Sequence, residues 1–119
     1  MINDKTDLDY LALALQQAQA CLVHQEVPIG AIVVNDAGQV IGTGRNTKET
    51  DQSVLGHAEL GAIKAAQKQV GNWRLTNCTL YTTLEPCPMC AGAILQARLK
   101  KVVIGATESR WGAAGSTVD

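Results

Sequence analysis

Two short segments of the 119-residue chain carry side chains that can bind a metal and move protons. The first contains His57 and Glu59, and the second contains Cys87 and Cys90. Cys87 and Cys90 are three residues apart, so on a helix they lie on one face and can bind the same ion. His57 can supply a third ligand. Two thiolates and one imidazole are a ligand set typical of Zn²⁺, so we predict a zinc ion bound by these three side chains.

Three protein ligands are the number expected for a catalytic zinc site, whose fourth position holds water. Binding to zinc lowers the pKa of water from about 15.7 to about 7, so hydroxide is available at neutral pH. Glu59 lies two residues after His57 in the sequence, near the metal without having to be a ligand. A carboxylate beside such a site can take a proton from water and deliver one to a substrate. We therefore predict that Glu59 is the catalytic acid and base of a hydrolytic reaction.

A structural zinc site is the competing interpretation, and such a site normally has four protein ligands. Candidates for a fourth ligand are Cys21, His24 and Cys78. Cys21 and His24 are one turn apart in a predicted helix, but the residues around them are typical of an ordinary core. Cys78 begins a predicted strand and is more typical of a small buried apolar residue. The combination of H-x-E with a later P-C-x-x-C favours the catalytic interpretation.

The elements that must position these residues alternate between strand and helix after residue 39. Thr6 is typical of a helix N-cap, and apolar residues from Leu8 to Leu22 recur at helical spacing. Residues 45–56 are polar without a period and are predicted to form a loop. Helices are predicted at about 7–25, 57–70 and 86–100, and strands at 29–34, 39–44, 78–83 and 101–106. This order predicts an α/β fold, with both metal-binding segments at helix N-termini that favour thiolate.

Length and composition are those of a single globular domain covering residues 1–119. The net charge is −1, and the sequence contains no Phe. Asp4, Asp7 and Asp9 lie where a secretory signal needs positive charge, and no apolar run is long enough to span a bilayer. We therefore expect a cytoplasmic protein with no membrane partner. In that compartment, four cysteines indicate metal binding or catalysis rather than disulfides.

Taken together, the two segments match the signature of the zinc-dependent cytidine and deoxycytidylate deaminase superfamily. Within it, the chain most resembles the bacterial tRNA adenosine deaminases, through VPIGAIVV, VIGTGRN, HAEL, GNWRLTNCTLYTTLEPCPMCAGAI and GAAGS. The resemblance implies a three-layer α/β/α cytidine-deaminase-like fold with a mixed sheet, and a homodimer with active sites near the interface. Relatives continue with a fifth strand and a closing helix, so we interpret this chain as C-terminally shortened, with four strands.

The resemblance also implies an activity, deamination of the wobble adenosine of a tRNA anticodon loop to inosine. Water activated by the zinc would attack C6 of adenine, and Glu59 would carry the protons. Asn46, the backbone N–H of Ala58 and the carbonyl of Glu85 would contact the flipped nucleoside or the water at the zinc. Relatives usually read Asp-Pro-Thr-Ala before H-A-E, whereas this chain has Ser-Val-Leu-Gly at positions 53–56. The loop that borders the pocket therefore departs from the family pattern.

Other functions are open from the sequence. Sister families use the same zinc motif on free guanine, cytosine or a deoxynucleotide, and a zinc-stabilised nucleic-acid-binding domain made inactive by truncation is a further alternative. Base flipping requires least free energy from an unstacked strand, which suits an anticodon loop. Single-stranded DNA offers the same advantage, so it stays open as a partner.

Overall fold

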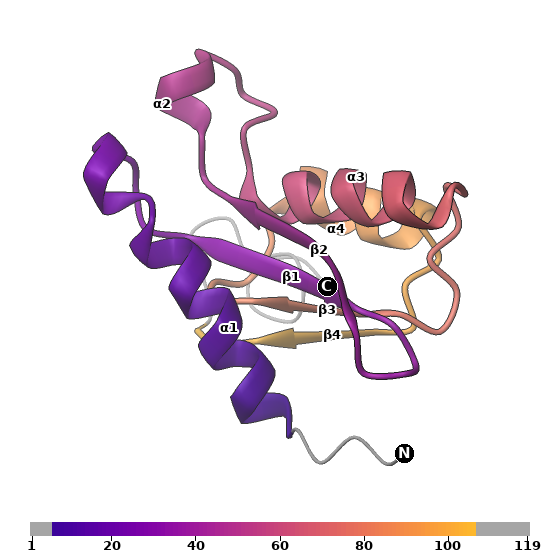
Figure 1. The fold of residues 1–119 in the computed structure, drawn as a ribbon. Coiled ribbons are helices and arrows are strands. Elements are labelled where there is room, and N and C mark those ends of the chain that lie inside the picture. The colour runs from indigo at the N-terminus through magenta and orange to yellow at the C-terminus, as the bar shows by residue number, and fades with distance from the viewer. Residues whose placement is uncertain (1–5, 107–119) are drawn as a thin grey trace.

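The computed structural model describes residues 6–106 and shows a mixed four-stranded sheet with helices on both faces (Figure 1). The strand order is β2-β1-β3-β4, with bounds Val40–Arg45, Gly30–Val34, Thr79–Thr82 and Lys101–Ile104. β1 is antiparallel to β2 and to β3, whereas β3 and β4 are parallel and need a crossover between them. The predicted α/β fold with a mixed sheet is confirmed.

Helices cover the two faces of the sheet unequally (Figure 1). Their bounds are Asp7–Gln19 for α1, Lys48–Asp51 for α2, Ala58–Val70 for α3 and Pro88–Gln96 for α4, with a short 3₁₀ helix, η1, at Leu22–His24. Side chains of a strand point to alternate faces. Ala31 and Val33 of β1 therefore pack with α3 and α4, whereas Ile32 and Val34 pack against α1. Two apolar cores result, one on each face.

The first helix begins as predicted and ends early. Thr6 and Asp9 form a capping box, in which the Asp9 N–H donates to Thr6 Oγ1 and the Thr6 N–H donates to Asp9. The helix ends at Gln19 instead of continuing to about residue 25. Its buried face also differs from the predicted apolar pattern, because Leu8 and Leu15 are exposed whereas Tyr10, Ala14 and Ala18 are buried. The sheet and α1 approach too closely for larger side chains.

Glycines let α3 lie close to β2, and this contact places the N-terminus of α3. A Cβ added to Gly44 would overlap the backbone of Ala58 and Ala62. We predict that Gly44→Ala destabilises the protein by about 1–3 kcal/mol or more, because backbone must move to relieve the overlap. Gly92→Ala is the matched control, since nothing lies within 4 Å of a Cβ there. Alanine in that helix interior should stabilise by about 0.5–1 kcal/mol, and denaturant unfolding of both variants measures the difference.

Two further differences concern element ends. α4 ends at Gln96, not near residue 100, because the chain turns at Arg98, whose φ is +63°. The stretch predicted as a loop contains the one-turn helix α2. None of the helices within residues 6–106 combines the length and apolar character that crossing a membrane requires.

Candidate metal and substrate site

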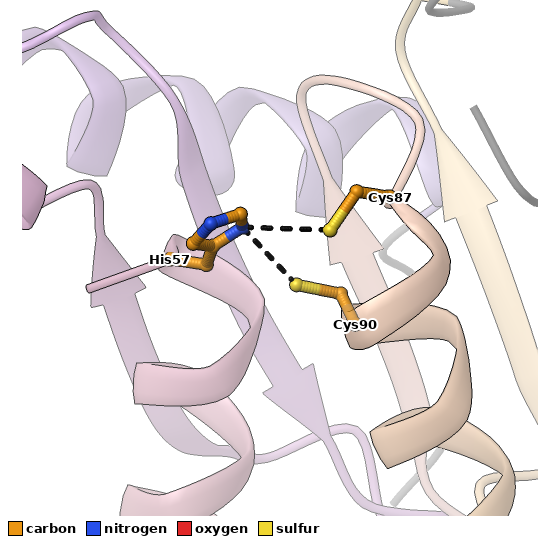
Figure 2. Close-up of side chains that lie close together, drawn as sticks. All are labelled: His57, Cys87 and Cys90. Carbon is orange, nitrogen blue, oxygen red and sulfur yellow. Dashed lines mark hydrogen bonds between the residues drawn. The ribbon is translucent and has the colours of Figure 1, made fainter. Parts of the chain in front are cut away.

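The N-termini of α3 and α4 meet at the candidate site (Figure 2). His57 is the N-cap of α3 and Cys87 is the N-cap of α4, both with extended backbone. Pro88 then occupies the first turn of α4, where its fixed φ favours helix and its missing N–H costs nothing. Cys90 follows one turn into the helix. Local sequence therefore starts each helix at the residue that carries a candidate ligand.

The three candidate ligand atoms are spaced for one metal ion. His57 Nδ1 lies 3.7 Å from Cys87 Sγ and 3.4 Å from Cys90 Sγ, and all three atoms lie within 4.8 Å of one another. Typical Zn–N and Zn–S lengths at a tetrahedral angle place nitrogen and sulfur about 3.6 Å apart. The observed separations lie on either side of this value. His57, Cys87 and Cys90 thus fit a zinc ion, and in residues 6–106 they are the one group of this kind.

The protonation of these side chains agrees with metal binding. Burial, and then the charge of Lys48, lower the pKa of His57, so the ring is neutral at pH 7 and can be a ligand. Burial raises the pKa of the Cys90 thiol, and the negative charges of Glu59 and Cys87 add to this effect. Without a cation, the thiolate form of Cys90 is therefore disfavoured beside these two groups. A divalent cation between them would reverse the balance and favour thiolate.

Glu59 lies in the first turn of α3 and is only 4% exposed. Burial raises the pKa of its carboxyl, although hydrogen bonds to its own backbone N–H and to the Cys90 side chain act in the opposite direction. A carboxyl group with a raised pKa can both accept and donate protons near neutral pH. Its position beside the ligand cluster suits the role expected for it.

A cavity of about 300 Å³ opens beside the ligand cluster. It brings together six of the seven predicted site residues, and the seventh, Cys90, lies fully buried beneath it. Its lining combines apolar side chains, which suit a flat base, with a few polar side chains. The lining residues are Val27, Ile29, Asn46, Lys48, His57, Ala58, Glu59, Leu84, Glu85 and Cys87.

The predicted substrate-contacting residues line this cavity from three separate segments of the chain. Asn46 follows β2, is 9% exposed, and donates from Nδ2 to the Val27 carbonyl at 3.1 Å. Ala58 is the first residue of α3, where backbone N–H groups have no partner within the helix. Glu85 precedes the start of α4, and its N–H donates to the Ala106 carbonyl. The G-A-A-G-S sequence at 112–116 lies outside the described residues.

The competing ligands lie elsewhere. Cys21 is buried at the start of the 3₁₀ helix, with its thiol directed at the carbonyls of Ile29 and Asn46. His24 is exposed in the 3₁₀ helix, and Cys78 is buried in the core with its thiol pKa raised chiefly by burial. All four cysteines are free. The structure therefore favours the open, three-ligand interpretation over a closed structural site.

Sequence reasoning missed Glu26 and the pocket position of Lys48. Glu26 is a carboxylate only 5% exposed, yet it follows the end of a helix in a segment without periodicity. Its hydrogen-bond partners lie 23 and 24 residues further along the chain. Lys48 begins the one-turn helix α2 that no pattern indicated. For Glu26, the sequence offers one weak signal, an acidic residue directly before Val-Pro.

Comparison with known proteins matches most of the chain to one protein family. Residues 4–106 match the model of the cytidine and deoxycytidylate deaminase zinc-binding region. The tRNA-specific adenosine deaminase of Bacillus subtilis is 44% identical over 110 residues, which are 92% of this chain and 68% of that protein. The tRNA(Ile)-lysidine synthase of Deinococcus deserti is 48% identical over 106 residues, 89% of this chain. The match spans only 20% of the Deinococcus protein.

Solved structures agree with this relationship. A structure from a study of tRNA:A34 deaminases has a TM-score of 0.87 and 40% identity, covering 92% of this chain and 83% of the other. Guanine deaminase from Bacillus subtilis has a TM-score of 0.82 and 38% identity, covering 87% of this chain and 66% of the other. The fold is thus shared by proteins that act on different bases.

Proposed function

Because the chain belongs to the cytidine and deoxycytidylate deaminase zinc-binding family, we propose that it hydrolytically deaminates adenosine in nucleic acid, at the wobble position of a tRNA anticodon loop. The observation that carries the chemistry is a buried carboxylate beside a Cys-Cys-His cluster in one cavity. The relatives named for tRNA modification, the adenosine deaminases and the lysidine synthases, support tRNA as the substrate.

In the proposed reaction, His57, Cys87 and Cys90 would hold a zinc ion, which would make hydroxide available near neutral pH by lowering the pKa of water to about 7. The Glu59 carboxylate accepts a proton from the attacking water and delivers one to N1 of adenine. It then takes the proton of the new hydroxyl group on C6 and passes it to the amino group on the same carbon. The C6–N bond breaks, ammonia leaves, and the C6 carbonyl of inosine remains. The raised pKa of Glu59 supports both directions of transfer.

The substrate would be held by groups from three segments. The Asn46 side-chain amide has two N–H groups, and the one that does not donate to Val27 would donate to the nucleoside. The Ala58 N–H at the start of α3 and the Glu85 carbonyl contact the base or the water. A base presented in this way is first flipped out of its stack, which an anticodon loop permits at low free-energy cost. We also propose that the protein is a cytoplasmic homodimer. Light scattering of the purified protein tests the oligomeric state.

Incubation of the zinc-loaded protein with an anticodon stem-loop that carries adenosine at the wobble position tests this function. We expect inosine at that position at low salt, with slower turnover as salt rises, because phosphate contacts weaken. Nucleoside analysis by mass spectrometry measures the product. Formation of deoxyinosine at an equal rate in a single-stranded DNA of the same sequence would contradict the choice of RNA as substrate.

The likeness to guanine deaminase supports a second candidate, deamination of a free purine. Release of ammonia from guanine with no inosine in the stem-loop would favour it. A protein that binds zinc and RNA but converts neither substrate would instead be a binding domain.

A further inference from the structure

The segment between β2 and α3 forms one wall of the candidate pocket. It supplies Asn46 and Lys48 to the cavity and contains the one-turn helix α2. Such a short helix has little stability of its own, because helix nucleation is unfavourable and is recovered only over longer helices. The position of Asn46 and Lys48 therefore depends on contacts that this segment makes with the rest of the protein.

Glu26 makes the most concentrated of these contacts. Its carboxylate accepts three hydrogen bonds from α2, from the Glu49 N–H at 3.0 Å, the Thr50 N–H at 2.6 Å and the Thr50 hydroxyl at 2.6 Å. A buried carboxylate is costly unless its oxygens are hydrogen-bonded, and here both are. These bonds also lower the pKa of the Glu26 carboxyl, so it stays ionised at neutral pH. The negative charge satisfies N–H groups at the start of α2 that have no partner within the helix.

The residues around Glu26 hold Asn46 in the same way. The Val27 carbonyl accepts from Asn46 Nδ2, and the Ile29 carbonyl accepts from the Asn46 N–H at 3.0 Å. Asn46 Oδ1 in turn accepts from the Lys48 N–H at 3.0 Å. Segment 26–29 therefore contacts both the Asn46 amide and the start of α2. Val27 and Ile29 of this segment also line the cavity.

We propose that Glu26 is a positioning residue for the substrate, acting by anchoring α2 so that Asn46 and Lys48 stay fixed at the pocket. This inference rests on the proposed function, since its first test measures turnover. Glu26 contacts none of the zinc ligands by hydrogen bond, so its loss should affect substrate binding more than the chemical step. The expected signature is a rise in KM with little change in kcat.

Glu26→Gln tests the proposal, because glutamine keeps the size of the side chain but sets an NH₂ group against N–H donors. With the adenosine stem-loop we expect KM to rise about tenfold, because a tenfold change corresponds to the loss of about one charge-assisted hydrogen bond. The kcat should stay within about twofold of the parent value. Zinc content should stay at about one per chain. Glu26→Asp, which keeps the charge, should recover part of the effect. Glu49→Gln is the matched control, since it removes an exposed carboxylate of the same helix.

Several outcomes overturn the proposal: a parental KM in Glu26→Gln, or a loss of kcat and zinc together with KM. If Glu26→Gln does not fold, Thr50→Val removes one of the three donors and should raise KM about threefold. Amide hydrogen exchange provides a readout independent of turnover. In Glu26→Gln we expect faster exchange at Glu49 and Thr50 with α3 unchanged, and unchanged exchange at these amides refutes the anchoring role. If the parent protein shows no turnover, but Glu26→Gln still exchanges faster than the parent at Glu49 and Thr50, only the proposed function is contradicted.

Discussion

Substitution of Glu59 by glutamine is expected to lower kcat by about 10²- to 10⁴-fold while zinc content stays at about one per chain. The amide has the shape of the carboxyl group but cannot transfer protons between water and a base. Glu59 lies nearly buried beside Cys90, and burial raises the pKa of its carboxyl, which suits the proposed transfer of protons in both directions. Steady-state inosine formation, together with metal analysis of the same preparation, measures both quantities.

Glu49→Gln is the control for this experiment, because it makes the same chemical change on an exposed residue of the pocket loop. Its kcat should equal that of the parent. Near-parental kcat in Glu59→Gln would refute the role given to Glu59. Loss of zinc in that variant would instead indicate that the carboxylate acts as a metal ligand.

The candidate metal site and Glu59 were predictable because each part is encoded locally. His57 and Glu59 are separated by one residue, and Cys87 and Cys90 by one helical turn that Pro88 helps to start. Once both segments begin helices, only the packing of α3 and α4 on the same face of the sheet is needed to bring them together. The alternation of strands and helices indicated that packing. The family resemblance added Asn46, Ala58 and Glu85, which line the same cavity.

The parts that the sequence did not predict depend on contacts between distant residues. α2 forms where the polar pattern indicated a loop, because the Glu26 carboxylate, 23 and 24 residues earlier, accepts from its first N–H groups. The buried face of α1 has the small residues Ala14 and Ala18 beside Tyr10, because Gly30 of β1 lies against the backbone of the two alanines. Periodicity alone ranks leucine above alanine as a core residue. It cannot register how closely two backbones approach.

Cys87→Ala is expected to abolish stable zinc binding. Two remaining ligands cannot complete the three-ligand set, so metal content should fall from about one per chain to near zero after dialysis against a mild chelator. The change also removes the stabilisation that zinc gives to the folded state. Free zinc at about 1,000 times its Kd stabilises a protein by about 4 kcal/mol, and the variant should lose most of this gain. Elemental analysis and thermal unfolding with and without zinc measure the two effects.

Cys87 is a better choice than Cys90 for this test, because Cys90 is fully buried and its truncation would also leave a cavity. Cys78→Ala is the matched control, since it removes a buried thiol that lies in the core on the α3–α4 face and not among the ligands. Its baseline stability should fall slightly, yet zinc should raise its Tm as in the parent. Full zinc occupancy in Cys87→Ala would exclude the ligand set His57, Cys87 and Cys90. Equal loss of zinc in Cys78→Ala would show that the metal responds to general core damage, and the assignment of Cys87 would then lack support.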